Sequence, residues 1–210
     1  MTPGQKRWRG WTRALTDTTR RQQRSSPWMS LLLLSALVCA NAFAVAGAQE
    51  TTVILVRHAE KGDTPANDPG LTEAGAARAK ALLAIAREAG VTAVITTQFA
   101  RTRETARPAA EALGITSEVA RAGGAAAQHA QDVARMVHAH AGGVVLVVGH
   151  SNTIPAIVAA LGAPQPPPIC DSEYDDLYIV TLGANPPAHV IRARYGAPSP
   201  ADAGCASMKP

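Results

Sequence analysis

The chain has few cysteines and no cluster of histidines and cysteines with metal-ligand spacing. Its three cysteines, Cys39, Cys170 and Cys205, are far apart in the sequence, and none belongs to a CxxC pair. This arrangement excludes a zinc ribbon or a similar structural metal site. We therefore expect no metal and no other cofactor.

Aromatic residues are also scarce, at 4% of the chain, and no basic stripe with interleaved aromatic residues is present. The excess of positive charge is confined to residues 1–48, which hold 7 basic residues and 1 acidic residue. From residue 49 onward 13 basic and 15 acidic residues remain, a net charge of −2. Nucleic acid is therefore not an expected partner.

An apolar stretch over residues 31–38 is short and follows this basic segment. Small residues come next, and together they predict a signal peptide over residues 1–48 with cleavage near Ala46 or Ala48. Translation from Met29 and an uncleaved membrane anchor over residues 29–48 are the alternatives. We expect an exported protein, periplasmic or secreted, with no stable membrane span after cleavage.

Strand and helix patterns alternate over residues 49–195, which predicts one α/β domain followed by a tail over residues 196–210. The expected architecture is a three-layer sandwich, in which a mostly parallel mixed sheet has helices on both faces. Strands are predicted over 52–56, 92–96, 115–119, 144–148, 177–182 and 189–194. Helices are predicted over 73–90 (with Thr72 as N-cap), 102–113, 126–141 and 154–161.

Two of these strands end in a histidine. Residues 52–56 run into Arg57 and His58, and residues 144–148 run through Gly149 into His150. The carboxyl ends of parallel strands share one edge of a sheet, where α/β proteins bind ligands. An arginine there fixes a phosphate through bidentate hydrogen bonds, and a histidine attacks it or moves a proton.

A third strand edge supplies more positive charge. The strand over residues 92–96 leads to Arg101 at the start of the next predicted helix. Taken alone, an arginine–histidine pair is typical of a solvated strand end. Two histidines and two arginines that come from three strand ends instead favour a phosphate pocket formed by Arg57, His58, Arg101 and His150.

At these residues the chain resembles the histidine phosphatase superfamily, which has the phosphoglycerate mutase-like fold. The likeness covers about residues 51–195 and depends on four motifs: Arg57-His58-Ala59-Glu60, Leu71-Thr72-Glu73-Ala74-Gly75, Arg101-Thr102-Arg103-Glu104-Thr105-Ala106 and Gly149-His150-Ser151-Asn152. Glu173-Tyr174-Asp175 resembles small or exported phosphatases of this superfamily rather than its mutases.

The resemblance implies that His58 is the nucleophile, and that Arg57, Arg101 and His150 bind the phosphoryl group. A doubly protonated His150 and the two arginines would stabilise the charge of the transition state. Asn152 and Lys61 are further candidates for substrate binding.

The chain departs from larger members of the family in one respect. They carry a glutamate general acid in an insertion between the second arginine and the second histidine, and the corresponding stretch here is short. Glu60, Asp63 and Glu104 are weak candidates for that acid, each more typical of a structural carboxylate. A missing acid favours substrates with good leaving groups.

Export also bears on the cysteines. If Cys39 leaves with the signal peptide, Cys170 and Cys205 remain as a pair in an oxidising compartment, which predicts a disulfide between them. Of the remaining histidines, His129 is expected to be exposed.

The sequence thus predicts an exported, metal-independent phosphatase that hydrolyses a small phosphomonoester or related compound through a phosphohistidine on His58. The alternatives are a non-catalytic module that binds a phosphorylated ligand and, less favoured, a phosphoglycerate mutase.

Overall fold

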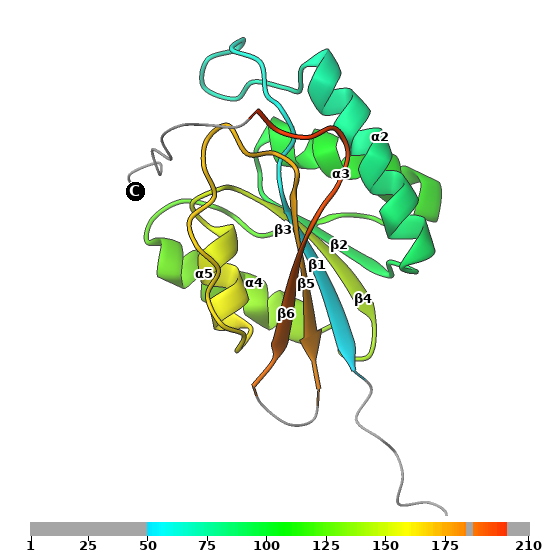
Figure 1. Cartoon of the computed structure of the whole chain (residues 1–210), viewed down its shortest axis with the longest axis vertical. Coiled ribbons are helices and arrows are strands. Elements are labelled where there is room, and N and C mark those ends of the chain that lie inside the picture. The colour runs from blue at the N-terminus through cyan, green and yellow to red at the C-terminus, as the bar shows by residue number, and fades with distance from the viewer. Residues whose placement is uncertain (1–49, 184–186, 201–210) are drawn as a thin grey trace, which may run out of the picture. The chain divides into compact units, whose positions relative to one another are not determined.

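The computed structural model describes residues 50–183 and 187–200, which form one mixed sheet with helices on both faces (Figure 1). The predicted signal peptide and most of the predicted tail lie outside these residues, so both stay predictions. Within the described residues, no helix is long and apolar enough to cross a bilayer.

The sheet has six strands in the order β3-β2-β4-β1-β5-β6. β1 pairs in parallel with β4 and antiparallel with β5, and β6 forms the antiparallel edge beyond β5. The mixed, mostly parallel sheet is therefore confirmed. The strand bounds are β1 Thr51–Arg57, β2 Ala93–Thr96, β3 Glu118–Val119, β4 Val144–Gly149, β5 Asp176–Leu182 and β6 His189–Arg194.

β3 has two residues, whereas the sequence predicts a strand over 115–119. Gly114 ends the preceding helix in the left-handed conformation, with φ of 67°. The backbone N–H of Ile115 then donates back to the carbonyl of Ala110 in that helix. Residue 115 therefore belongs to the helix cap, and the chain reaches the sheet only at Glu118.

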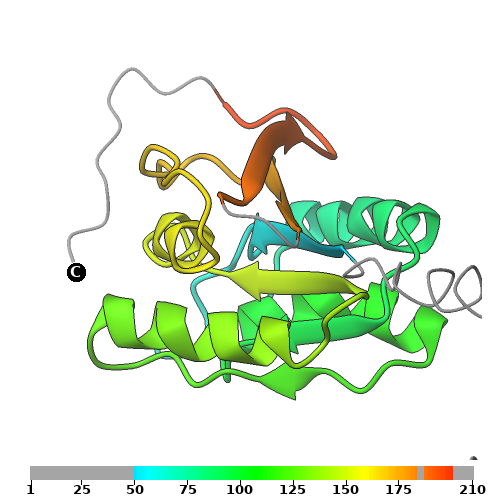
Figure 2. The same cartoon turned by 90° about the horizontal axis from the view of Figure 1, so that it is seen from below.

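The helices are α2 Glu73–Glu88, α3 Ala100–Leu113, α4 Ala126–His138 and α5 Ile154–Ala160. α2 packs with α3 and α4 packs with α5, and the two pairs cover opposite faces of the sheet (Figure 2). This confirms the predicted three-layer sandwich. The predicted N-cap is also confirmed, because the Thr72 hydroxyl accepts from the backbone N–H of Gly75 at 3.1 Å.

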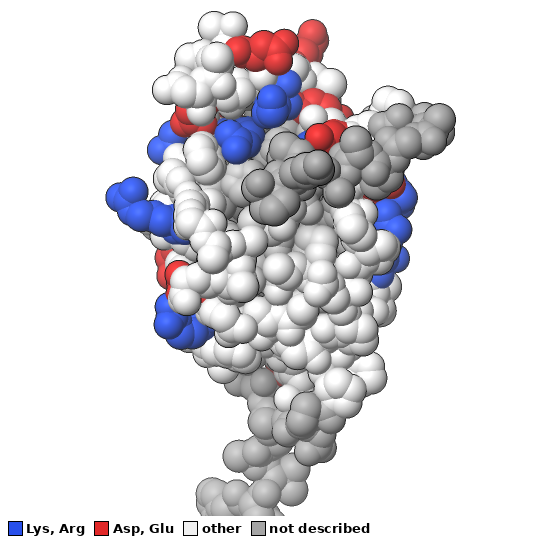
Figure 3. Space-filling view, turned by 90° about the vertical axis from the view of Figure 1, so that its left-hand side faces the viewer, with Lys and Arg blue, Asp and Glu red and all other residues white. Residues whose placement is uncertain are grey.

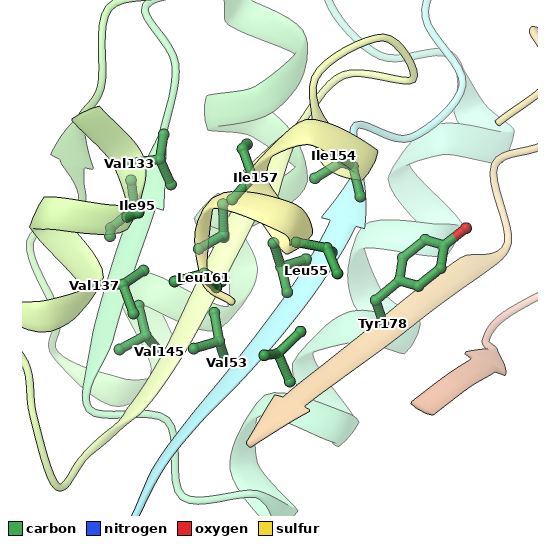
Figure 4. Close-up of a cluster of buried hydrophobic side chains, with 14 of the residues drawn as sticks. Val53, Leu55, Ile95, Val133, Val137, Val145, Ile154, Ile157, Leu161 and Tyr178 are labelled. Carbon is green, nitrogen blue, oxygen red and sulfur yellow. The ribbon is translucent and has the colours of Figure 1, made fainter. Parts of the chain in front are cut away.

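Alternation along β1 divides the core into two layers. Val53 and Leu55 contact the α4 and α5 side, whereas Ile54 and Val56 contact the α2 and α3 side. Successive side chains of a strand point to opposite faces, so a strand buried on both faces reads as a continuous apolar run. Figure 4 shows the first layer, in which the Tyr178 hydroxyl points away from the aliphatic cluster.

The start of α2 lies against the segment that follows β1. A Cβ placed on Gly75 would come within 2.2 Å of the carbonyl oxygen of Glu60. Only glycine fits this approach, which fixes the helix against the chain two residues after His58.

Candidate active site

His58 and His150 follow neighbouring parallel strands at the same level. Arg57, the last residue of β1, pairs with Gly149, the last residue of β4. The backbone N–H of His58 also donates to the Gly149 carbonyl at 2.9 Å. Both rings are buried, and their centroids lie 5.4 Å apart in an edge-to-face arrangement.

Arg101 lies in the first turn of α3, after β2. Its guanidinium stacks on the ring of Phe99 at 4.3 Å from the centroid, and the Phe99 ring in turn meets the ring of His150 at 5.5 Å. Asp68 accepts from the backbone N–H of Ala100 at 2.8 Å and lies 3.8 Å from the Arg101 guanidinium. Asp68 therefore ties the loop after β1 to the start of α3.

Arg57 is held from the opposite side by the segment before β5. Its Nη1 donates to the carbonyls of Cys170, Asp171 and Glu173 at 2.8, 2.8 and 2.9 Å. Its guanidinium also stacks on the ring of Tyr174, 4.1 Å from the centroid. Both site arginines are thus stacked on an aromatic ring, an arrangement that fixes the plane of the guanidinium.

Two cavities adjoin at Arg101, which is in the wall of both. One, of about 410 Å³, is lined by Arg57, His58 and the loop containing Lys61. The other, of about 250 Å³, is lined by His150, Asn152 and Phe99. Between them, the walls of these two cavities contain all four predicted phosphate-pocket residues.

Burial lowers the pKa of His58 to about 2, and the positive charges of Arg57 and Arg101 add to that effect. The ring is therefore neutral at physiological pH. Its Nδ1 lies 2.8 Å from the carbonyl of Ala59, which can only accept, so Nδ1 carries the proton. Nε2 keeps its lone pair, as a nucleophile requires.

Burial also lowers the pKa of His150, to about 3, and Arg101 contributes next. The expectation of a doubly protonated His150 is therefore wrong for the protein by itself. The ring is oriented by a hydrogen bond of 3.1 Å between its Nε2 and the Thr97 hydroxyl, which is linked at 2.9 Å to the hydroxyl of Thr102.

These two depressed pKa values predict that acid destabilises the protein. Unfolding would return both histidines to a pKa near 6.5, so the unfolded chain binds protons that the folded chain excludes. Stability is fully present above pH 6.5 and falls as pH drops toward about 3. Each histidine should cost roughly 2 kcal/mol at pH 5. Urea unfolding of the wild type and of His150→Asn at pH 7 and pH 5 measures this, and equal pH slopes for the two proteins would contradict it.

None of the three candidate general acids lines either cavity. Glu60 accepts from Arg78 through both carboxylate oxygens; burial alone would raise its pKa, but these bonds outweigh it and the pKa is lowered. Glu104 accepts from the backbone N–H of Leu71 at 2.7 Å, and Asp63 is exposed. Glu60 and Glu104 therefore have structural partners, and the proton donor is not found among these residues.

The two candidates for substrate binding lie on opposite sides of the site. Lys61 is exposed in the wall of the larger cavity, and Asn152 is exposed in the wall of the smaller one. The described residues contain no group of three or more histidine, cysteine or acidic side chains placed to hold a metal ion. The catalytic and binding roles of these residues stay predictions.

Sequence reasoning missed Phe99 and Asp68 and gave His129 the wrong environment. His129 was expected to be exposed, but it is 4% exposed and lies in the wall of the smaller cavity. The available signal was helical spacing, because His129 precedes Val133 and Val137 at intervals of four on the buried face of α4. No sequence pattern marks Phe99 or Asp68, which reach the site only through tertiary contacts.

Cys170, whose carbonyl accepts from Arg57, is disulfide-bonded. Its predicted partner Cys205 lies outside the described residues, so the pairing stays a prediction.

Charged groups on the face shown in Figure 3 are mixed rather than of one sign. Toward the upper end of this view, Lys and Arg side chains lie beside Asp and Glu side chains, and much of the middle is uncharged. This distribution favours a small anion in a local pocket over a long polyanion.

Comparison with known proteins gives a partial match to one family model and a shared fold. Residues 53–122 match the model of the histidine phosphatase superfamily (branch 1). This segment contains Arg57, His58 and Arg101 but ends before His150. No curated protein sequence matches the chain significantly.

Solved structures match over more of the chain. The mycobacterial glucosyl-3-phosphoglycerate phosphatase Rv2419c is 15% identical, with a TM-score of 0.50, and the match covers 63% of this chain and 90% of that one. The protein histidine phosphatase SixA, complexed with tungstate, is 18% identical, with a TM-score of 0.53 and coverages of 68% and 96%. Bacillus stearothermophilus YhfR is 20% identical, with a TM-score of 0.52 and coverages of 67% and 95%. At these identities the structures show the shared phosphoglycerate mutase-like fold.

Proposed function

We propose that the protein is a metal-independent phosphatase of the histidine phosphatase superfamily, whose model matches residues 53–122, and that it acts on a small phosphorylated compound. His58 is its nucleophile. The structural likeness to a glucosyl-3-phosphoglycerate phosphatase and to a protein histidine phosphatase that holds tungstate, a tetrahedral oxyanion, supports this proposal.

The observation that carries the proposal is the convergence of two neutral imidazoles and two fixed guanidiniums. The Nε atoms of Arg57 and Arg101 are both buried, and neither has a hydrogen-bond partner within the described residues. Unpaired buried donors are costly, and a bound oxyanion would satisfy them. The arginines therefore offer N–H donors to a phosphoryl group next to His58 Nε2.

In the proposed reaction the Nε2 lone pair of His58 attacks phosphorus and the ester P–O bond breaks. The leaving oxygen takes a proton from solvent and departs as the alcohol. Water then attacks the phosphohistidine, the P–N bond breaks, and inorganic phosphate is released. The arginines supply fixed positive charge to the phosphoryl oxygens throughout, which is the main requirement of phosphoryl transfer. A bound phosphate dianion would also raise the pKa of His150, so that this ring could donate to it.

The three carboxyl groups predicted as general acids do not line the pocket, and the carboxyl group that does line the larger cavity, that of Asp171, lies 3.8 Å from the Arg57 guanidinium. Where no carboxyl group protonates the departing oxygen, that oxygen must carry much of the developing charge. Substrates whose leaving groups are good, such as aryl phosphates, should therefore turn over fastest.

Turnover of p-nitrophenyl phosphate in the presence of EDTA tests the proposal. We expect phosphate release that is insensitive to EDTA, together with an acid-labile phosphoenzyme trapped by rapid quenching. Saturable phosphate binding without turnover would instead support the alternative of a binding module. Activity that disappears with EDTA and returns with a divalent ion would contradict the proposed chemistry.

We further propose that the protein is exported and that Cys170 pairs with Cys205. In the chain-entropy model, closing a loop of this length stabilises the fold by about 3–4 kcal/mol. It would also hold the segment whose carbonyls bind Arg57. We expect non-reduced peptide mapping of the secreted protein to yield one linked pair containing both cysteines; free thiols at both positions would contradict this.

A further inference from the structure

His129 is a buried histidine for which the reaction proposed above has no use. It lies in the first turn of α4 and is 4% exposed. Its Nδ1 is 3.1 Å from the carbonyl of Arg121, whereas its Nε2 is buried and has no hydrogen-bond partner within the described residues. Buried polar atoms are rarely left unpaired in native proteins, so this nitrogen requires an explanation.

The contact with Arg121 indicates which ring nitrogen carries the proton when the ring holds one. A carbonyl oxygen can only accept, so Nδ1 is the protonated nitrogen and Nε2 carries a lone pair. Nε2 is therefore an acceptor that lacks a donor. A ligand that satisfies it must bring an O–H or N–H group.

The position of His129 indicates which part of a ligand would carry this O–H or N–H group. The ring shares the wall of the cavity of about 250 Å³ with Arg101 and His150. These two residues belong to the phosphate pocket, so ligand atoms elsewhere in this cavity would belong to the group esterified to the phosphoryl oxygen. The volume corresponds to roughly eight water molecules, which suits a small leaving group.

The remaining walls narrow the chemistry of that group. Phe99, Ala122 and Ala126 present apolar surface suited to a carbon skeleton. Arg101 is a cation in the same wall and disfavours an ammonium group there. A carboxylate would need a donor where Nε2 of His129 offers a lone pair. A neutral hydroxyl satisfies all three conditions.

We propose that His129 determines substrate specificity by accepting, through Nε2, a hydrogen bond from a hydroxyl on the leaving group of a small alkyl phosphate. This inference rests on the proposed phosphatase function and deepens it, because it names the substrate class as hydroxylated alkyl phosphomonoesters. His129 is a binding residue that does not contact the reacting phosphorus.

Three esters with the same carbon chain test the proposal: propyl phosphate, 1,3-propanediol monophosphate and glycerol 3-phosphate. Of the two hydroxylated esters, we expect the one that the wild type hydrolyses better to exceed propyl phosphate by about tenfold in kcat/KM. This ratio corresponds to the net contribution of one hydrogen bond. In His129→Asn, whose amide can still donate to the Arg121 carbonyl, the preference should fall to about twofold or less. In His129→Gln, whose Oε1 can accept near the former Nε2 position, part of it should remain.

The ratio of kcat/KM values measured on one preparation does not depend on how much of the variant is correctly folded. His138→Asn, the same change at an exposed position of α4, is the matched control and should keep the wild-type ratio. An unchanged ratio in His129→Asn would mean that His129 has a purely structural role and would overturn the proposal. A wild-type enzyme without preference for the hydroxylated esters would overturn it as well.

p-Nitrophenyl phosphate separates the remaining outcomes, because its leaving group needs no proton. If His129→Asn loses activity on all three alkyl esters equally but keeps it on p-nitrophenyl phosphate, His129 is a proton donor and the recognition role is wrong. If the wild type fails to hydrolyse p-nitrophenyl phosphate, the proposed phosphatase function itself fails. If the wild type hydrolyses p-nitrophenyl phosphate but shows no preference among the three alkyl esters, only the proposed role of His129 is wrong.

Discussion

Replacing His58 with alanine should lower kcat/KM for p-nitrophenyl phosphate by at least about 10⁴-fold, the scale seen when a nucleophile is removed from an enzyme. The geometry explains why no other group can substitute. His58 Nδ1 is committed to the Ala59 carbonyl, and burial keeps the pKa of the ring at about 2, so Nε2 is an available lone pair at neutral pH. The ring of His150, the nearest imidazole in the site, is oriented by Thr97.

His58→Asn separates chemistry from folding, because an asparagine amide can retain the hydrogen bond to the Ala59 carbonyl but has no nucleophilic nitrogen. We expect it to fold, to bind inorganic phosphate and to be inactive. His189→Ala, at an exposed position of β6, is the control and should be fully active. Substantial turnover by folded His58→Ala, with no phosphoenzyme in the quenched wild type, would refute the assignment of His58 as nucleophile.

The second large effect is expected at Arg57, because this side chain serves both the site and the fold. Its Nη1 satisfies three backbone carbonyls of the segment before β5, while its Nε has no partner within the described residues. Arg57→Ala leaves those carbonyls without their donor and removes a fixed positive charge from the phosphate pocket. We expect a loss of about 2–4 kcal/mol in the free energy of unfolding and a decrease of roughly 10³-fold in kcat/KM.

Arg57→Lys distinguishes the two contributions. A lysine keeps the charge but lacks the planar fork, so it cannot hold three carbonyls and an oxyanion together. It should recover part of the affinity for inorganic phosphate, measured by competitive inhibition, but little of the lost stability, measured by urea unfolding. Arg107→Ala, at an exposed position of α3, should change neither quantity. An Arg57→Lys protein with wild-type stability would show that the carbonyl contacts are unimportant.

Much of the architecture follows from local patterns in the sequence. The uninterrupted apolar runs before His58 and His150 require strands buried on both faces, and alternating helical segments then require parallel connections. Caps such as Thr72 and Gly114 set helix ends through local hydrogen bonds and backbone conformation. Because the carboxyl ends of parallel strands share one edge, the pattern alone brought His58, His150 and Arg101 together.

The contacts of a side chain were less predictable where its partners come from distant segments of the chain. The carbonyls that bind Arg57 come from residues more than 100 positions away, and Asp68 reaches α3 from the loop after β1. The burial of Glu60 against Arg78 removed a candidate acid. The helical spacing could have placed His129 on the buried face of α4. No sequence pattern could have predicted that its Nε2 has no hydrogen-bond partner within the described residues.

By itself, the sequence determined which residues could carry charge and nucleophilic character at the carboxyl edge of the sheet, because strand and helix periodicity are local properties. The tertiary structure alone decided their protonation and orientation. The pKa of a histidine depends on how much water its neighbours exclude, and the direction of an arginine depends on which carbonyls and rings surround it. Those neighbours are brought together only when the sheet and both helical layers have packed.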